Sequence, residues 1–303
     1  MHTLTLNLVD SSKSDIKYKI SKFPDGQQTV DIVSTVERMW GFRNIQIISR
    51  LNSFTDLELI ICANQAFKNM DEQLKIELFV PYFLGSRSDR KFVEGGINYL
   101  KQVICPIINS QNFSNVVVMD PHSDVLEACL NNYTKINNHT LVEWAINQIG
   151  VPKDNICLVS PDAGAYKKIA DVAKSVNISN IITAHKTRDI VTGNITGTYI
   201  PLNVYDAIKT FVIIDDICDG GRTFIELAKE IMKSRMLSSV VHPNEYGKIY
   251  LIITHGIFSA GFDKLNECFD GIFSTDSVRT IGDYVSDSYG NQIKTNLKQL
   301  NIF

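Results

Sequence analysis

Short apolar segments rich in β-branched residues recur along the chain, and each is followed by a longer segment of mixed character. Near-continuous apolar runs of this length are typical of strands that are buried on both faces of a sheet. The intervening segments carry apolar residues at helical spacing, as at Phe224, Leu227 and Ile231. This alternation predicts an α/β protein with mainly parallel sheets. The expected strands are residues 45–48, 76–80, 116–119, 156–159, 181–184, 211–214 and 249–253.

A strand that runs into an acidic loop occurs once in each half of the chain, with Asp120 in the first half and Asp215 in the second. The repetition predicts two similar domains, each a mainly parallel sheet flanked by helices. A polar stretch at Asn137 and Asn138 precedes a new helical segment, so we place the boundary there. The predicted domains are residues 1–137 and 138–303. Residues 236–247 are rich in turn-forming residues and are expected to form a loop.

Composition narrows the classes of protein to which the chain can belong. Its 303 residues suffice for two domains, and 44% hydrophobic with 21% charged residues is typical of soluble globular proteins. A net charge of −3 gives no strong field toward nucleic acid or a membrane surface, so neither is expected as a partner. The six cysteines form no C-x-x-C pair, which indicates reduced thiols and a cytoplasmic location. We expect neither a signal peptide nor a membrane span.

Residues 215–223 combine two carboxylates, a third acid, two glycines, an arginine and a threonine between a strand and a helix. Ligands of α/β sheets bind at the carboxyl ends of strands, and glycines with a helix start can surround a phosphate with N–H groups. The adjacent acids suit the 2- and 3-hydroxyls of a ribose, or a metal bound to them. The alternative is a loop with an acidic helix cap. The predicted ribose-phosphate site is Asp215, Asp216, Asp219, Gly220, Gly221, Arg222 and Thr223.

The same nine residues resemble the phosphoribosyl diphosphate motif that phosphoribosyltransferases and ribose-phosphate pyrophosphokinases share. Five other segments match only the pyrophosphokinases, in order and over nearly the whole chain: residues 23–26, 81–91, 119–123, 159–164 and 254–259. The chain therefore resembles a divergent ribose-phosphate pyrophosphokinase. The resemblance implies two phosphoribosyltransferase-like domains, an N-terminal one that contacts ATP and a C-terminal one that binds ribose phosphate.

What the resemblance implies for chemistry is a transfer of the β,γ-diphosphate of ATP to the anomeric hydroxyl of ribose 5-phosphate, with release of AMP. It assigns ATP binding to Phe23, Asp25, Arg87, Asp89 and His122, and it assigns Mg²⁺ to His122 and Asp162. Without the resemblance, Phe23 would more often be a core residue, and His122 would be an ordinary polar loop residue. On ligand type alone His122 is unusual for Mg²⁺, which prefers oxygen.

Residues 184–189 follow a predicted strand and resemble the family's mobile catalytic loop. By that match, Lys186 and Arg188 stabilise the transferred diphosphate, because cations are needed where negative charge accumulates. Taken alone, the segment would be a solvated basic loop. The family completes its sites with a neighbouring subunit, so the resemblance also implies a homo-oligomer.

Several positions depart from the family pattern. Gly220 stands where a threonine is usual, and Arg222 stands where a glycine is usual. The missing hydroxyl removes a hydrogen bond worth about 0.5–1.5 kcal/mol, while Arg222 adds a forked cation suited to phosphate. We therefore expect the acceptor to be ribose 5-phosphate or a 5′-extended relative such as ADP-ribose, and the product to serve nucleotide synthesis or NAD metabolism. Further departures are Gln27, Ser88 and Ala165, and His242 lies in an inserted loop, where an exposed structural position is the simpler interpretation.

Two alternatives to the pyrophosphokinase stay open. A phosphoribosyltransferase needs only residues 215–223 and has no reason to keep Arg87 and His122. A non-catalytic regulatory homologue would be expected to lose Lys186, Arg188 or His122, and all three are present.

Overall fold

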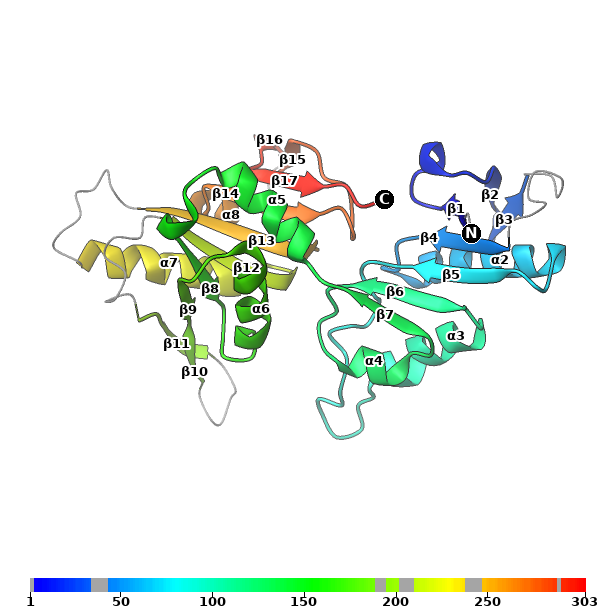
Figure 1. Cartoon of the computed structure of the whole chain (residues 1–303), viewed down its shortest axis with the longest axis horizontal. Helices are drawn as coiled ribbons and strands as arrows, with labels where there is room; N and C mark the ends of the chain where they lie inside the picture. The colour runs from blue at the N-terminus through cyan, green and yellow to red at the C-terminus, as the bar shows by residue number, and fades with distance from the viewer. Residues whose placement is uncertain (1–2, 34–42, 189–194, 202–209, 238–246, 288–289) are drawn as a thin grey trace. The chain divides into compact units, whose positions relative to one another are not determined.

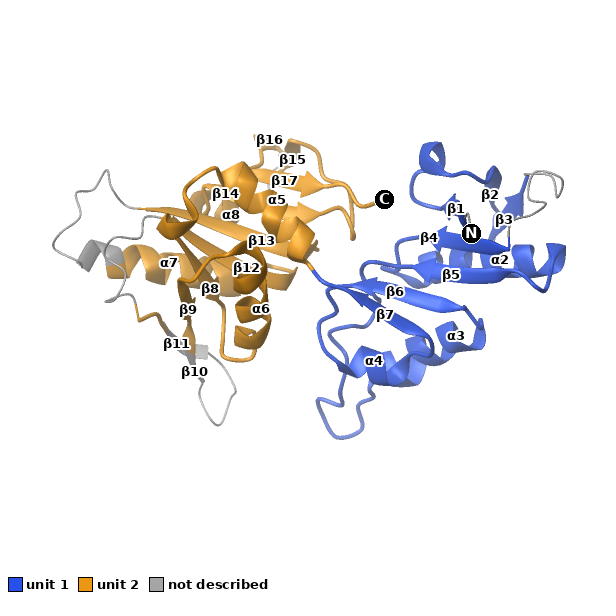
Figure 2. Cartoon of the chain, viewed as in Figure 1, with its two compact units in different colours: residues 1–137, 303 blue, residues 138–302 orange. Residues whose placement is uncertain are grey.

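The computed structural model describes residues 3–33, 43–188, 195–201, 210–237, 247–287 and 290–303 (Figure 1). The chain folds as two compact units, residues 1–137 with Phe303 and residues 138–302 (Figure 2). The roles that the sequence assigns to the two domains stay predictions. Among the described helices, none is long and apolar enough to cross a membrane.

The first unit is built on a five-stranded parallel sheet with the order β1-β4-β5-β6-β7. Its strands are β1 (Thr3–Asn7), β4 (Asn44–Ile48), β5 (Lys75–Phe79), β6 (Asn115–Met119) and β7 (Tyr133–Ile136). Its helices are α2 (Phe54–Met70), α3 (Cys105–Ser110), α4 (Val125–Cys129), the 3-10 turn η1 (Ser11–Lys13) and the π-helical turn η2 (Leu100–Ile104). Helix α2 begins at a capping box, because Ser53 and Asp56 satisfy each other's backbone N–H groups.

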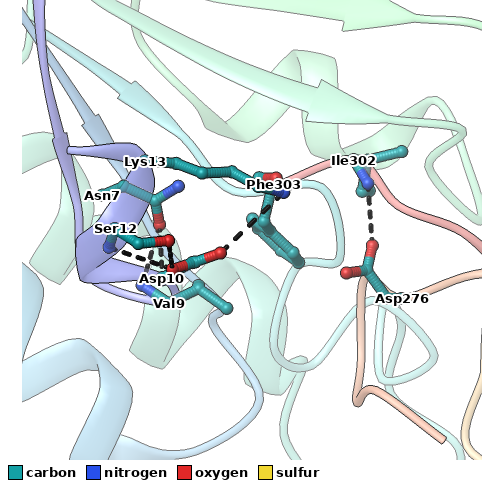
Figure 3. Close-up of polar contacts among 8 residues, drawn as sticks. All are labelled: Asn7, Val9, Asp10, Ser12, Lys13, Asp276, Ile302 and Phe303. Carbon is teal, nitrogen blue, oxygen red and sulfur yellow. Dashed lines mark hydrogen bonds and ion pairs between the residues drawn. The ribbon is translucent and has the colours of Figure 1, made fainter. Parts of the chain in front are cut away.

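An antiparallel hairpin of β2 (Tyr18–Lys22) and β3 (Gln28–Ile32) joins this unit beside α2. The turn after β1 is held by Asn7, whose side-chain oxygen accepts the N–H groups of Val9 at 3.0 Å and Asp10 at 2.9 Å (Figure 3). Asn7 is buried, so these bonds satisfy a polar group that has left water.

The second unit contains a six-stranded parallel sheet with the order β17-β14-β13-β12-β8-β9. Its strands are β8 (Ile156–Ser160), β9 (Ile181–Thr183), β12 (Thr210–Cys218), β13 (Lys248–Gly256), β14 (Gly271–Thr275) and β17 (Leu297–Leu300). Its helices are α5 (His139–Ile149), α6 (Tyr166–Val176), α7 (Arg222–Leu237), α8 (Asp263–Cys268) and the 3-10 turn η3 (Lys153–Asn155). Two hairpins complete the unit, β10 (His185–Arg188) with β11 (Ile195–Tyr199) and β15 (Tyr284–Ser286) with β16 (Gln292–Lys294).

The core of the second unit lies on both faces of this sheet. One cluster contains Phe211, Ile213 and Leu227, and the other contains Val212, Ile214 and Leu158. Successive residues of β12 thus enter opposite clusters, as expected for a strand covered on both sides.

The predicted α/β class with parallel sheets flanked by helices is confirmed, and each of the seven predicted strands is present. Of the strands in the two parallel sheets, the sequence missed β1, β7, β14 and β17, because polar residues interrupt their short apolar runs. The prediction that β12 stops at Ile214 was wrong, since the strand continues to Cys218. The predicted loop begins too early, because Met236 and Leu237 belong to α7, and most of the remainder, with His242, lies outside the described residues.

Candidate functional site

The carboxyl end of β12 carries the two adjacent acids. Parallel pairing with β13 continues past them, with Asp215 opposite Ile253 and Ile217 opposite His255. Asp216 is buried, and its N–H donates to Asp215 Oδ1 at 2.9 Å. The sheet therefore fixes the backbone of the acidic pair, which a free loop would leave mobile.

The Asp215 carboxyl has a pKa well above its usual range, because burial disfavours its ionised form and the neighbouring Asp216 repels it. Lys168 on α6 acts in the opposite direction but does not outweigh these two effects. Two adjacent acids that repel each other are unusual in a strand that serves only a structural role. Hydroxyl groups or a cation brought by a ligand would relieve this strain.

Residues 219–221 form the turn between β12 and α7. Gly221 has φ of +75°, and a Cβ atom there would lie 3.0 Å from Leu265 Cδ2, so this position requires glycine. Gly220 differs, since a Cβ atom there would meet Ser259 and Ala260 only at 3.9 Å. Helix α7 begins at Arg222, and Phe224 N–H in its first turn donates to Gly221 O at 3.0 Å. The N–H groups of Arg222 and Thr223, which precede it, lie where helix starts commonly bind anions.

The loop that follows β13 contacts this turn directly. Ile257 N–H donates to Cys218 O at 2.8 Å, and Ser259 Oγ donates to Asp219 Oδ1 at 2.5 Å. The Ser259 N–H also donates to the Asp219 carbonyl oxygen at 3.2 Å. These bonds hold Asp219 in place from a segment forty residues further along the chain. Residues 254–259 were expected only from the family resemblance, and the role of Ser259 could not be predicted from its local sequence.

Arg222 projects away from the turn. Its side chain is 86% exposed, and its Nε donates to Glu226 Oε1 at 2.8 Å one turn further along α7. An exposed ion pair of this kind contributes little to stability, so the guanidinium can leave it for a phosphate at small cost.

Asp162 follows β8, which is the neighbour of β12 in the sheet. Its Oδ1 accepts the Ala165 N–H at 3.1 Å, and Ser160 Oγ donates to the Asp162 carbonyl oxygen at 2.7 Å. The carboxyl ends of parallel neighbours meet at one edge of the sheet, so Asp162 and the acidic pair share that edge. Lys186 and Arg188 lie on β10, which follows β9, and their side chains are outside the described residues.

In the first unit, the segments after β5 and β6 also meet at one edge of a sheet. Met119 N–H donates to Pro81 O at 3.0 Å, which ties the two strand ends together. Asp120 is buried and has φ of +43°, and its N–H donates to Ile136 O at 2.7 Å. Gly85 approaches Tyr99 so closely that a Cβ atom would lie 2.8 Å from the ring, so glycine is needed in this turn as well.

Asp89 links these segments electrostatically. It is buried, which by itself would raise the pKa of its carboxyl, yet that pKa is lowered. Arg90 Nε donates to Asp89 Oδ1 at 3.0 Å, and the charges of Arg90 and His122 also favour the ionised form. The structure therefore brings Asp89 and His122 near each other, and both Arg87 and His122 are exposed to solvent.

The turn of the β2–β3 hairpin contains Phe23 and Asp25. Phe23 is 51% exposed, so the interpretation of Phe23 as a core residue was wrong. Asp25 Oδ1 accepts the Gln27 N–H at 3.1 Å, which shapes the turn. The hairpin packs on α2, and Figure 1 shows it on the β1 side of the unit, whereas Arg87 and His122 follow β5 and β6.

The donor groups of the described side chains indicate how a Mg²⁺ ion could be bound. Among the described residues, no three His, Cys, Asp or Glu side chains gather as a metal site. His122 and Asp162, the predicted metal ligands, belong to different units. Mg²⁺ keeps several waters and is commonly bound through one or two carboxylates with substrate phosphates. The acids present therefore fit a Mg²⁺ ion that arrives with a nucleotide better than one held by the protein alone.

No protein-family model matches the chain. Curated relatives do match. A ribose-phosphate pyrophosphokinase of Mycoplasmopsis pulmonis is 23% identical over 91% of this chain and 82% of its own length. A ribose-phosphate pyrophosphokinase of Xanthomonas axonopodis is 24% identical over 86% of this chain and 78% of its own length. A ribose-phosphate pyrophosphokinase of Marinomonas sp. is 23% identical over 76% of this chain and 71% of its own length.

Among solved structures, the chain resembles phosphoribosylpyrophosphate synthetase from Mycobacterium smegmatis. The TM-score is 0.70, the sequence identity is 16%, and the likeness covers 95% of this chain and 86% of the other. This likeness establishes the fold.

Proposed function

We propose that this chain, a divergent member of the ribose-phosphate pyrophosphokinase family, transfers the β,γ-diphosphate of ATP to the anomeric hydroxyl of a ribose phosphate and releases AMP. The observation that carries the proposal is the end of β12. There a buried acid pair, a glycine turn and the first turn of α7 follow one another within nine residues. This arrangement presents acceptors for sugar hydroxyls beside donors for a phosphate.

On the acceptor side, Asp215 and Asp216 would accept hydrogen bonds from the 2- and 3-hydroxyls of the ribose. The raised pKa of Asp215 supports this role, because donated hydrogen bonds favour the ionised form and offset the repulsion from Asp216. The 5′-phosphate would bind the N–H groups of the turn from Asp219 to Thr223, where the positive end of the α7 dipole adds attraction.

On the ATP side, Arg87 would bind the phosphates, and Phe23 and Asp25 would contact the adenine. The resemblance implies that a neighbouring subunit completes such sites, so we propose that the hairpin of a second copy, which carries Phe23, completes each ATP site. A homo-oligomer is therefore part of the proposal. Asp89 is held ionised by its surroundings and would orient Arg90 and His122 toward the nucleotide.

Mg²⁺ bound with ATP would neutralise charge on the phosphates, and His122 and Asp162 would contact it from the protein. Lys186 and Arg188 would then stabilise the charge that accumulates on the transferred diphosphate. The anomeric hydroxyl oxygen would attack the β-phosphorus of ATP directly and lose its proton to solvent. The bond between that phosphorus and the oxygen that leaves with AMP would break, so no protein nucleophile is required.

Acceptor identity follows from the turn. Gly220 lacks the hydroxyl that is usual in the family, and a Cβ atom there would only touch Ser259 and Ala260, at 3.9 Å. Arg222 is exposed and forms a surface ion pair with Glu226. These features leave room for a 5′-phosphate that continues into a larger group, so we propose ribose 5-phosphate or an extended relative such as ADP-ribose as the acceptor.

The test is AMP release from Mg²⁺-ATP with each acceptor. Lys186→Ala should reduce turnover by about a hundredfold or more while ATP binding is retained, because its interaction is made in the transition state. Lys174→Ala, an exposed lysine on α6, is the matched control and should leave turnover unchanged. An equal rate for Lys186→Ala and wild type would remove Lys186 from the mechanism.

AMP release also separates this function from the two alternatives. A phosphoribosyltransferase would consume a ready-made phosphoribosyl diphosphate and a nucleophilic base without forming AMP. A regulatory homologue would bind ATP and leave it intact.

A further inference from the structure

A hollow of about 680 Å³ lies in the second unit, between the loop of residues 258–263 and the segment of residues 279–287. None of the residues that line it is among those assigned above to ATP, ribose phosphate or metal. A volume of this size is typical of sites that bind small molecules of nucleotide dimensions.

One wall of the hollow is also the segment that holds the acceptor turn. Ser259 lines the hollow, and its hydroxyl donates to Asp219 Oδ1 at 2.5 Å. Ala260 lines it as well, and its Cβ lies 3.9 Å from the position of a Cβ at Gly220. A ligand held on the turn that extends past Gly220 therefore meets Ser259 and Ala260 first and reaches the hollow next.

The lining combines a cation, hydroxyl groups and an apolar floor. Arg279 Nη2 donates to the Phe258 carbonyl oxygen at 3.2 Å, which orients the guanidinium and leaves its other N–H groups for an anion. Ile281 and Val285 are half-buried and pack on the core beneath. Such a surface can take a phosphate at the cation and an apolar ring face at the floor.

Two carboxylates also line the hollow, and they restrict what fits. Asp287 accepts hydrogen bonds from the N–H and the side-chain amide of Asn291 at 2.7 and 3.0 Å, and Asp263 starts α8. Their negative charge disfavours a bare polyanion, whereas sugar hydroxyls can donate to carboxylate oxygens. A nucleoside monophosphate satisfies all three parts of the lining.

We propose that this hollow binds the nucleoside monophosphate half of a 5′-extended ribose acceptor, while the turn of residues 219–223 binds the ribose that reacts. The inference rests on the proposed diphosphate transfer and assigns its acceptor specificity to Arg279 and the β15–β16 hairpin. Ribose 5-phosphate, which ends at its phosphate, would not enter the hollow.

The test fills the hollow without changing the turn. Ser286→Trp places a large ring on a lining position of β15, and Tyr284→Trp places the same ring two residues away on an exposed position that does not line it. For Ser286→Trp we expect the KM for ADP-ribose to rise by about tenfold or more, whereas the KM for ribose 5-phosphate changes by less than about twofold. Tyr284→Trp should leave both values unchanged. Arg279→Gln should also raise the KM for ADP-ribose alone, by about tenfold, because one charge-assisted hydrogen bond is lost.

The outcomes distinguish the inference from the function on which it rests. Activity with ribose 5-phosphate but none with ADP-ribose would overturn the inference and leave the transfer reaction standing, and so would equal effects of Ser286→Trp on both acceptors. If neither acceptor gave AMP, the proposed function would fail. Calorimetric measurement of ADP-ribose binding would then test the inference separately. Binding that is weakened by Ser286→Trp but not by Tyr284→Trp would support binding in the hollow. Undetectable binding, or binding that Ser286→Trp does not affect, would overturn it.

Discussion

Each of the two sheets has an acidic segment at the carboxyl end of one strand, and the chain leaves the strand differently in the two segments. After β6, the strand stops at Met119, and Asp120 turns the chain with a positive φ and an N–H bond to Ile136. In β12, the strand continues through Asp215 and Asp216 to Cys218, and the positive φ is delayed to Gly221. The first edge thus carries its acids in a loop, and the second carries them in the sheet.

The two edges also differ in the direction in which the pKa of an acid is shifted. At the first edge, the pKa of Asp89 is lowered because the Arg90 hydrogen bond and the charges of Arg90 and His122 favour its ionised form. At the second edge, the pKa of Asp215 is raised because burial and Asp216 outweigh Lys168. The carboxylate at the first edge is stabilised by cationic side chains, while the acids at the second edge repel each other. In the proposed reaction, sugar hydroxyls bound at the second edge would offset that repulsion.

The largest effect should come from removing both charges at the second edge. The double variant Asp215→Asn, Asp216→Asn should lower kcat/KM for the ribose phosphate by about a hundredfold or more, since two hydrogen bonds to charged groups are lost at about 1.5–3 kcal/mol each. Asp154→Asn, at an exposed position of the same unit, is the control. Steady-state AMP release measures both, and comparable rates for the double variant and wild type would contradict the assigned role.

Single asparagine variants at the two edges should change stability in opposite directions. Asp89→Asn should lower the free energy of unfolding by about 1–3 kcal/mol, because favourable bonds to a buried carboxylate are weakened. Asp215→Asn should leave it unchanged or raise it, because a repelled buried charge is removed. Calorimetric melting of the full chain compares them, and a loss of stability in both variants would show that the edges do not differ.

The two glycines of the turn offer a smaller contrast. Gly221→Ala should lower the free energy of unfolding by about 1–2 kcal/mol, because a positive φ is unfavourable for alanine and its Cβ would press on Leu265. Gly220→Ala should change the free energy of unfolding by less than about 0.5 kcal/mol, since the atoms nearest to the new Cβ are 3.9 Å away. Urea unfolding of both variants measures the difference, and equal costs would mean that the turn differs from the one described.

The pH dependence should be the mildest effect. The stabilisation from Asp89 is present above its ordinary unfolded pKa, about 3.9, and is lost as the pH falls through its lower folded value. For Asp215 the folded pKa is raised, so wild type loses stability relative to Asp215→Asn as the pH rises from about 3.9 through that folded value. Melting temperatures of wild type and both variants across that range should diverge with opposite slopes, and parallel curves would refute the assignment.

Much of the fold could be predicted from the sequence, because a strand buried on both faces must be apolar along its whole length. Residues 116–119 and 156–159 show this plainly, and both became central strands. Strands β14 and β17 could not be found in this way. Ser274 and Gln299 interrupt their apolar runs, and only the finished sheet shows that Gln299 donates to Thr275 O and that Ser274 is buried.

The acid–glycine segment of residues 215–223 was determined by the sequence itself, since its residue types and spacing require no distant partner to be recognised. The tertiary structure decided what those residues experience. Pairing of Ile217 with His255 extends the strand through the acids, Ser259 holds Asp219 from forty residues away, and Lys168 approaches from α6. The hollow beside the turn arises in the same way from residues 258–263 and 279–287. A local pattern can specify which groups a site contains, whereas burial, pKa and cavity volume depend on contacts between segments that meet only when the sheet is complete.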